Sequence, residues 1–292
     1  MSLKVKFNLI LLLTGMIGIG ITALIAFNIQ RDNARTEALE TAAVLLESAL
    51  AVRNYTVEEV RPLIAAQSAQ RFLPQTVPAY AAASYIENLR AQHPNYDYKE
   101  AALNPTNPSN RAADWEADII HYFRSHKDAG KMVGERETPT GRSLYLSKPI
   151  RISNQKCLIC HSTPSAAPDT MIERYGNSNG FGWKHNEIIG AQIVSVPLSL
   201  PLARAKEEFI VFMSALLGVF FCIGVVLNLL LKRYVIHPVT AMASHVDKVS
   251  MGTLDMPELT LTGNDEIASL GRSFNRMQRS LDSAVKMLEE EE

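Results

Sequence analysis

The residues of this chain best suited to chemistry lie together in the segment Cys157-Leu158-Ile159-Cys160-His161. Two thiols separated by two residues, with an imidazole directly after the second, form the pattern that attaches c-type haem. That spacing sets the thiols across one edge of the macrocycle, where they add to its two vinyl groups. The next residue, His161, then points toward the iron. The motif predicts one covalent haem c, attached at Cys157 and Cys160, with His161 as the metal ligand.

Two other chemistries also use paired cysteines. A redox-active disulfide usually belongs to a thioredoxin-like fold, and no βαβ pattern surrounds Cys157 and Cys160. A structural zinc site needs four ligands, but the chain has only three cysteines, and the third, Cys222, lies within an apolar stretch. Both remaining cysteines fall in this one motif, so haem attachment is the favoured interpretation.

The ligand on the other side of the iron stays open. Haem iron takes His, Met, Cys or Tyr in different proteins, or keeps one side free for a gas. The candidates are His93, His121, His126, His185, Met132, Met171 and Tyr55. A lone histidine is more often a surface or core residue than a ligand, and Tyr55 could instead pack on the porphyrin edge. An open or weakly ligated site is favoured over any single candidate.

The propionate groups of a haem need cations or hydrogen-bond donors. The candidates are Arg53, Arg61, Arg111 and Lys184, each of which could equally be a solvated surface charge. Phe181 and Trp183, in a loop rich in glycine and asparagine, could pack on the macrocycle or fill the core. We expect Arg53, Tyr55, Phe181 and Trp183 to help bind the cofactor.

Two uncharged apolar stretches, residues 9–27 and 209–231, flank the motif. Each is long enough to cross a bilayer as a helix, which takes roughly 20 residues. The first is longer than the roughly 7–15 apolar residues of a cleaved signal peptide, so we expect it to stay as an anchor. The positive charges before the first stretch and after the second are Lys4, Lys6, Lys232 and Arg233. These four charges predict a two-pass protein of the bacterial inner membrane, with both termini cytoplasmic and the motif in the periplasm. Some basic residues also lie at the ends of the apolar stretches that face the motif.

The segment between the apolar stretches mixes helix and strand patterns. Residues 31–51 continue the first helix, with an apolar stripe at Ala43, Leu46, Ala49 and Leu50. Further helices are predicted at residues 80–91 and 114–124, and strands at 96–102, 132–137, 143–152 and 188–196. The turn at residues 138–141 joins two of these strands as a hairpin. Helices with a small antiparallel sheet make an α+β fold.

Six short motifs between residues 52 and 200 carry a resemblance to a known family. They are Arg53-Asn54-Tyr55-Thr56, Val60-Arg61-Pro62, Val77-Pro78-Ala79-Tyr80-Ala81-Ala82, residues 100–108, residues 157–161, and Gly180-Phe181-Gly182-Trp183. Together they closely resemble the single-haem, PAS-like sensor domain of bacteria and cyanobacteria, long catalogued as a domain of unknown function. The resemblance covers about half the chain and implies a PAS-like fold, covalent haem c and a sensory role. One type in this family takes a cysteine from the N-terminal helical region as second ligand. No cysteine precedes Cys157 here, so that ligand is not carried over.

The C-terminal part predicts two amphipathic helices joined by a connector. The first has apolar residues at Val239, Met242, Val246 and Val249, and the connector has Gly252, Leu254, Leu259 and Leu261. The second has a heptad seam at Ile267, Leu270, Phe274, Met277, Leu281, Ala284 and Leu288. In a monomer both seams would be exposed. The position below a membrane helix, with Pro238 and Asp265-Glu266, resembles a HAMP signalling module, which implies a parallel four-helix coiled coil in a homodimer.

These patterns divide the chain into five predicted segments. They are a membrane helix at residues 1–30, a periplasmic PAS-like haem c domain at 31–206, a second membrane helix at 207–232, a HAMP module at 233–288 and an acidic tail at 289–292. A net charge of -1 gives no indication of a nucleic-acid partner, whereas membrane lipid is an expected one.

The function that these segments favour is sensing. A change in redox state, or a gas such as NO or O2, would act on the haem and pass through the HAMP helices to a cytoplasmic signalling protein. The alternative is a membrane-tethered monohaem cytochrome that exchanges electrons with a redox partner. An enzyme such as a peroxidase is not expected, because one haem without a recognised catalytic motif fits that class least.

Overall fold

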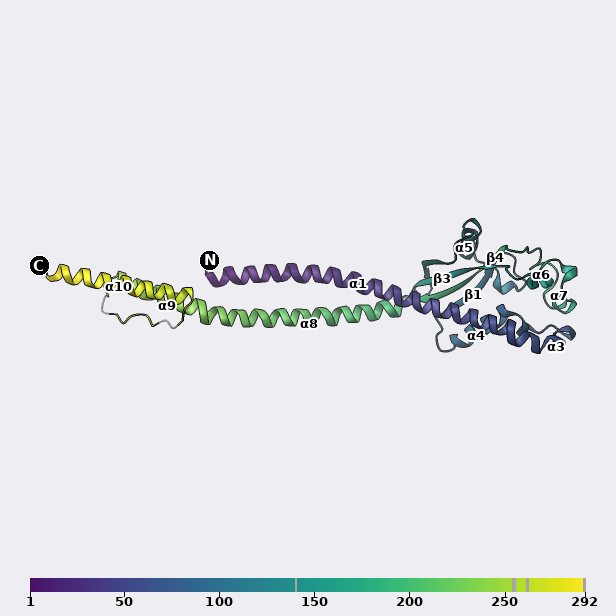
Figure 1. Ribbon diagram of the computed structural model, residues 1–292, viewed down its shortest axis with the longest axis horizontal. Coiled ribbons are helices and arrows are strands. Elements are labelled where there is room, and N and C mark those ends of the chain that lie inside the picture. The colour runs from purple at the N-terminus through teal and green to yellow at the C-terminus, as the bar shows by residue number, and fades with distance from the viewer. Residues whose placement is uncertain (140, 254–255, 261–262, 291–292) are drawn as a thin grey trace. The chain divides into compact units, whose positions relative to one another are not determined.

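The computed structural model describes residues 1–139, 141–253, 256–260 and 263–290 of the chain (Figure 1). The chain forms two compact units. One comprises Phe27–Phe209 and is called the sheet unit; the other comprises Met1–Ala26 with Ile210–Glu292 and is called the helical unit.

Helices α1 (Leu3–Tyr55) and α8 (Ser199–Leu231) contribute residues to both units. The other helices of the sheet unit are α2 (Arg61–Leu63), α3 (Ala65–Gln70), α4 (Pro78–Arg90), α5 (Asp114–Ser125), α6 (Leu158–His161) and α7 (Asp169–Tyr175). Its strands are β1 (Asp97–Ala102), β2 (Met132–Thr138), β3 (Gly141–Arg151) and β4 (Ile188–Pro197). The helical unit also contains α9 (His237–Ser250) and α10 (Glu266–Glu290). Short π-helical turns at Thr56–Val60 and Lys232–Ile236 follow α1 and α8.

The four strands form one antiparallel sheet in the order β1-β4-β3-β2. All ten residues of β4 are buried, because β1 and β3 flank it and helices cover both faces of the sheet. The predicted α+β class is confirmed, and so are the four strands, the hairpin, and the helices α4 and α5, each within a few residues of the expected bounds. Thr140, in the predicted hairpin turn, lies outside the described residues.

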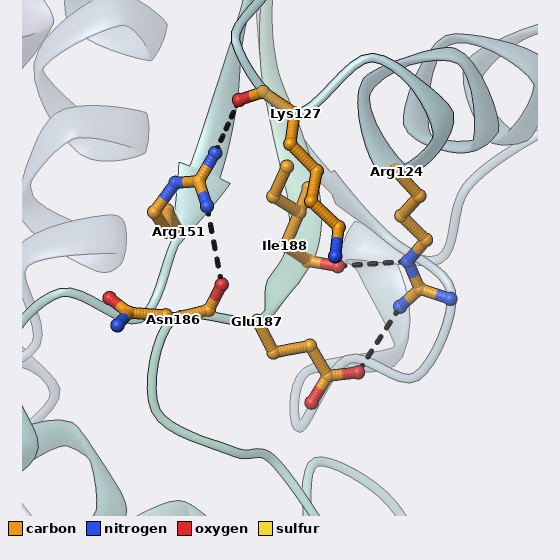
Figure 2. Close-up of a pocket in the computed structure, with 6 residues that line it drawn as sticks. All are labelled: Arg124, Lys127, Arg151, Asn186, Glu187 and Ile188. Carbon is orange, nitrogen blue, oxygen red and sulfur yellow. Dashed lines mark hydrogen bonds and ion pairs between the residues drawn. The ribbon is translucent and has the colours of Figure 1, made fainter.

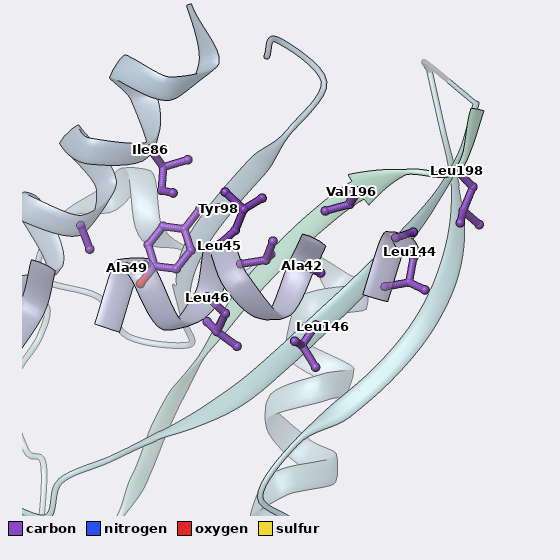
Figure 3. Packing of buried hydrophobic residues seen from close by; sticks show 13 residues of the cluster. Ala42, Leu45, Leu46, Ala49, Ile86, Tyr98, Leu144, Leu146, Val196 and Leu198 are labelled. Atoms are coloured by element: carbon purple, nitrogen blue, oxygen red, sulfur yellow. The ribbon is translucent and has the colours of Figure 1, made fainter. Parts of the chain in front are cut away.

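One face of the sheet packs against α1 (Figure 3). The buried residues of the helix are Ala34, Ala38, Ala42, Leu45, Leu46 and Ala49. From Ala38 to Ala49, they form one cluster with Leu144, Leu146, Val194 and Val196 of the sheet. Of the four residues predicted to form the apolar stripe of this helix, Leu46 and Ala49 are buried. Ala43 and Leu50 are only partly buried, so the buried face is rotated from the predicted one. Ala38, Ala42 and Ala49, spaced by four and seven residues on one side of the helix, let its backbone approach the sheet closely and define the contact line instead.

The opposite face packs against α5, whose Ile119, Ile120 and Phe123 are buried over the sheet. A buried carboxylate also fixes this helix. The Glu116 carboxylate accepts a hydrogen bond of 2.7 Å from the N–H of Ala113, the residue before α5. It also forms an ion pair with Lys99 of β1 at 2.7 Å. These bonds satisfy the charge that burial would otherwise make costly. They also fix where α5 begins along β1.

In the helical unit, the apolar parts of α1 and α8 are long and apolar enough, by length and composition, to cross a membrane. Asp265 caps α10 by accepting the Ala268 N–H at 2.8 Å. Two side chains of α10 fix the described part of the connector: Asn275 exchanges two hydrogen bonds of 3.0 Å with the backbone of Leu259, and Gln278 donates to the Met256 carbonyl at 2.9 Å. Leu254 and Leu261, named above for the connector, lie outside the described residues.

Replacing Leu46 by alanine tests the contact between α1 and the sheet. Leu46 is fully buried, so we expect Leu46→Ala to lower the free energy of unfolding by about 2–5 kcal/mol through lost burial and a residual cavity. Val44, on the same helix, is 66% exposed, and Val44→Ala should stay within about 0.5 kcal/mol of wild type. Guanidinium unfolding of the detergent-solubilised chain measures both, and equal effects would contradict the packing described.

Candidate functional site

The Cys-x-x-Cys-His motif lies in the connection between β3 and β4. A 3₁₀ turn, Gln155–Cys157, leads into the single turn of α6. Asn154 starts this turn, because its side chain accepts the Lys156 N–H at 2.9 Å and its carbonyl accepts the Cys157 N–H at 3.1 Å. Both motif cysteines are free thiols and partly exposed. The local fold therefore presents two thiols and an imidazole on one short helical turn.

The imidazole of His161 is held on two sides. Its Nδ1 lies 2.8 Å from the Gly180 carbonyl oxygen and 3.4 Å from the Thr106 hydroxyl. Its ring stacks on the indole of Trp183, with ring centroids 3.9 Å apart and an interplanar angle of 14°. A carbonyl only accepts hydrogen bonds, so Nδ1 carries the proton and Nε2 keeps its lone pair. This is the tautomer of a histidine that ligates metal through Nε2.

Two loops build the surroundings of His161. The side chain of Asn104, after β1, accepts the Gly180 N–H at 3.2 Å and donates to the Phe181 carbonyl at 3.4 Å. Trp183 N–H donates to the His161 carbonyl at 3.2 Å, which closes the loop onto the motif. Gly180 has φ +82°, and a Cβ there would lie 1.9 Å from the Thr106 hydroxyl. Only glycine satisfies both the backbone angle and the close approach.

The electrostatics of the motif follow from its burial. Burial lowers the pKa of His161 below its usual value, and the hydrogen bond to Gly180 opposes this only in part. The imidazole is therefore neutral at pH 7, which is the form that binds metal. Burial raises the pKa of the Cys160 thiol; the positive charge of Arg61 opposes that shift and Cys157 adds to it. Arg61 thus lies close enough to the motif to act on it.

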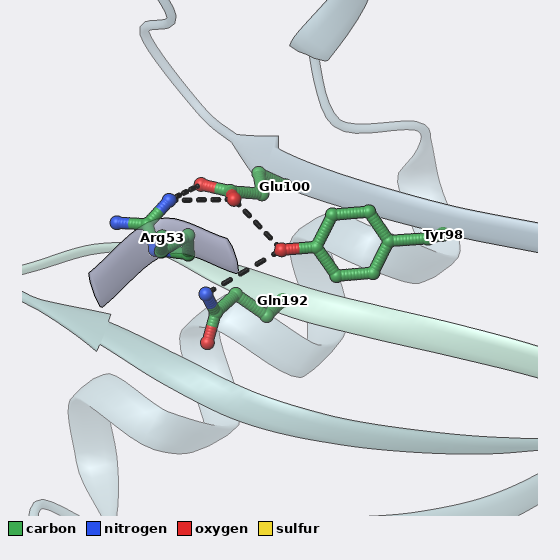
Figure 4. A network of polar contacts seen from close by, with 4 residues as sticks. All are labelled: Arg53, Tyr98, Glu100 and Gln192. Carbon is green, nitrogen blue, oxygen red and sulfur yellow. Dashed lines mark hydrogen bonds and ion pairs between the residues drawn. The ribbon is translucent and has the colours of Figure 1, made fainter. Parts of the chain in front are cut away.

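Arg53, expected at the cofactor, forms an ion pair with Glu100 of β1 (Figure 4). Tyr98 donates to the same carboxylate at 2.7 Å, and Gln192 of β4 lies 3.5 Å from the Tyr98 hydroxyl. Glu100 and Tyr98 are buried, and Arg53 is mostly so. The network joins the end of α1 to the sheet. Any contact of Arg53 with a propionate would have to share the guanidinium with Glu100.

The other expected site residues are spread over the sheet unit. Phe181 and Trp183 lie in the loop on His161, whereas Tyr55 is 62% exposed at the end of α1. Arg111 donates to the Asn179 side chain at 3.4 Å, just before that loop, and Lys184 is exposed just after it. The role of each in binding a cofactor stays a prediction.

Several candidate second ligands have other neighbours. His93 stacks on Tyr96 with centroids 5.1 Å apart, and His126 stacks on Tyr122 at 4.4 Å. Met132 packs with the cluster under α5 and Met171 is buried in α7, whereas His121 and His185 are exposed. The two stacked rings fit the interpretation of these histidines as surface residues.

Comparison with known proteins agrees with this architecture. Residues 30–197 match the family model described as Tll0287-like, and residues 230–283 match the HAMP domain model. The first match covers more than half of the chain, and the chain belongs to the Tll0287-like family. The solved structure described as the crystal structure of the cyanobacterial heme-protein Tll0287 is similar, with 14% sequence identity and a TM-score of 0.43 over 55% of this chain and 95% of that one. No curated protein matches the chain. The recognition of a PAS-like family followed by a HAMP module is confirmed.

A glycine pair tests the loop on His161. Gly180→Ala should destabilise the chain and release the His161 side chain, because the new Cβ collides with Thr106 and meets a backbone angle that disfavours it. Gly182 has φ +80° but open space around its Cβ position, so Gly182→Ala should carry only the backbone cost of about 1 kcal/mol. Unfolding midpoints of the two variants measure the difference, and equal midpoints would show that Thr106 does not make the close approach.

Alkaline titration tests the network at Tyr98. Burial, followed by the charge of Glu100, raises the pKa of Tyr98 well above its usual value. The folded state then holds a proton that the unfolded state loses above about pH 10, so this tyrosine makes stability fall by about 1.4 kcal/mol per pH unit there. Tyr98→Phe should be less stable at pH 8 but lose less stability from pH 10 to 11. Tyr85→Phe, at an exposed position, should keep the wild-type dependence of stability on pH. Denaturant titrations between pH 8 and 11 measure the free energy of unfolding of each protein. If Tyr98→Phe and wild type lost stability in parallel, the prediction would be contradicted.

Proposed function

We propose that this protein is a membrane-anchored sensor with one covalent haem c. The observation that carries the proposal is the fixed orientation of the His161 imidazole. Its Nδ1 lies within hydrogen-bond distance of the Gly180 carbonyl, and its ring stacks on Trp183. A fixed, neutral imidazole directly after two free thiols is the donor set of a c-type haem. The chain belongs to the Tll0287-like family, and the cyanobacterial Tll0287 is described as a heme-protein.

The residues present fit that cofactor. Cys157 and Cys160 would each add the S–H bond across one vinyl group, sulfur to one carbon and hydrogen to the other, without net oxidation. His161 would ligate the iron through Nε2. Ile159, between the thiols, is 59% exposed. An exposed apolar side chain of this size within the motif suits the face of a porphyrin. When bound, the haem supplies a redox centre or an iron that binds gas.

The chain from the motif to α8 passes through one strand, β4, with hydrogen bonds at both ends of that strand. The segment between β3 and β4 that carries the motif, residues 152–187, is called the motif loop. At its ends, the Asn186 N–H donates to the Ile152 carbonyl and the Ile152 N–H to the Glu187 carbonyl, both at 2.9 Å. β4 follows as the buried central strand, and Leu198 N–H then donates to the Arg142 carbonyl at 2.9 Å where α8 begins. A displacement of the motif loop would therefore reach α8 through one strand.

Helix α1 lies beside the start of α8 within the sheet unit. Arg204 of α8 pairs with Glu37 of α1 at 3.1 Å, and the rings of Phe27 and Phe209 meet edge to face with centroids 6.2 Å apart. A sliding or tilting of α8 against α1 is the movement that a HAMP domain converts into a change of helix packing. We infer a parallel homodimer in the inner membrane, with the sheet unit in the periplasm and a cytoplasmic protein as receiver.

The haem assignment is tested with cysteine variants. Wild type made in cells with c-type haem maturation should run, after denaturation, at the polypeptide mass plus one haem. The double variant Cys157→Ser, Cys160→Ser should lose the added mass, because both thioether bonds are removed. Cys222→Ser, outside the motif, should keep it. Mass spectrometry measures all three; a wild type without added mass, or a double variant that retains it, would overturn the assignment.

The signal itself is either redox state or a diatomic gas. Absorption spectra of the ferrous chain with and without CO separate these, since CO binds only where the iron has an open or labile side. A prompt, stoichiometric shift indicates gas sensing. An unchanged low-spin spectrum indicates two strong ligands and a redox signal.

A further inference from the structure

A hollow of about 230 Å³, open to solvent, lies where α5, β3 and β4 meet (Figure 2). Its walls are formed by Arg124 in the last turn of α5, Lys127 just after that helix and Arg151 at the end of β3. Asn186 and Glu187, just before β4, and Ile188, its first residue, complete them. Three of the six residues are positively charged and one is negatively charged. The space far exceeds the roughly 10–15 Å³ that one water molecule needs.

The two arginines are fixed in place by backbone carbonyls. Arg151 donates from Nη2 to the Lys127 carbonyl at 2.6 Å and from Nη1 to the Asn186 carbonyl at 3.4 Å. Arg124 donates from Nε to the Ile188 carbonyl at 2.9 Å. These bonds give the three carbonyl oxygens a donor, but a carbonyl carries no net charge, so the guanidinium charges are not neutralised. The two guanidinium groups are thus preorganised, so a ligand would pay little entropy to order them.

The carboxylate of Glu187, at the wall of the hollow, already has two partners. Glu187 pairs through Oε1 with Arg124 Nη2 at 3.6 Å, and its Oε2 accepts the Lys184 N–H at 3.0 Å. Among the described residues, no carboxylate oxygen lies within 4.0 Å of the charged groups of Lys127 or Arg151. The hollow therefore carries an excess of positive charge that its own residues leave uncompensated.

We propose that this hollow binds a small anion, an oxyanion such as phosphate or a carboxylate such as succinate. The ammonium of Lys127 and the guanidinium of Arg124 would contact it directly, as charge-assisted hydrogen bonds to such groups are strong. The bound anion would bridge α5 to the start of β4. Because Asn186 and Glu187 also bond to Ile152, it would stiffen the end of the motif loop and so give the sensor a second chemical input.

Calorimetric titration of the full chain in detergent, at pH 7 and low ionic strength, tests the site with inorganic phosphate and, separately, with succinate. At least one should bind saturably at one site per chain. Lys127→Gln should weaken that binding about tenfold through loss of a charged donor. Lys131→Gln, an exposed lysine outside the hollow, should leave it unchanged. Equal weakening by both variants would indicate general charge attraction and would overturn the site.

A third variant should change the anion affinity in the opposite direction. Glu187→Gln keeps an acceptor oxygen for Arg124 and Lys184 but removes the one negative charge among the described residues that line the hollow, so binding should become several-fold tighter. A variant that merely damaged the fold would not bind more tightly. Weaker or unchanged binding by Glu187→Gln, or no saturable heat from either anion with wild type, overturns the proposal.

A propionate of the proposed haem is also a carboxylate and offers a second source of the same chemistry. The double variant Cys157→Ser, Cys160→Ser separates the two. Equal binding of the free anion to wild type and to this variant supports a site for a free anion. Binding to the variant alone would mean that a propionate fills the hollow, and would overturn a free-anion site.

Discussion

The burial of β4 is the constraint on which the sheet unit depends. All ten of its residues are buried, with Val194 and Val196 under α1 and Ala191 and Ile193 under α5. A strand buried on both faces cannot slip by one residue without moving every side chain to the wrong face. It can move only together with the layers that cover it. One end of β4 follows the motif loop and the other leads into α8, so this rigid strand is the mechanical link between them.

The motif itself is built differently from its scaffold. It occupies one helical turn and two loops, and side-chain and backbone hydrogen bonds rather than a hydrophobic core hold it together. Loops carried on a rigid sheet are common places for function, since they can rearrange at low cost while the scaffold stays intact. Asn104 bonds to Gly180 and Phe181, and Gly180 bonds to His161, so these contacts join segments that precede and follow α5 in the chain. A change at His161 would therefore act on two connections of the sheet, the one after β1 and the one before β4.

The sequence was most informative where chemistry or periodicity is local. The motif is contiguous, and the strands show alternating or continuous apolar patterns, so both were predictable. The contact line of α1 was not, because an alanine-rich helix offers two adjacent stripes and only the shape of the sheet selects between them. Arg53 also looked like a propionate ligand, since its ion-pair partner Glu100 lies 47 residues further along the chain. Asn104 and Thr106 were visible only as a loop signal, because their bonds to Gly180 and His161 are long-range.

In the proposed mechanism, the oxidation or ligand state of the haem changes the packing of the HAMP helices. The most direct measurement is crosslinking between subunits in membranes, with a bismaleimide and a chain carrying Cys222→Ser and Met277→Cys in α10. The crosslinking yield should differ between oxidised and reduced protein, or with and without NO, and the difference should disappear when Cys157 and Cys160 are serine. An identical yield in every state of the haem-loaded chain would rule out signalling through HAMP and favour a tethered electron carrier.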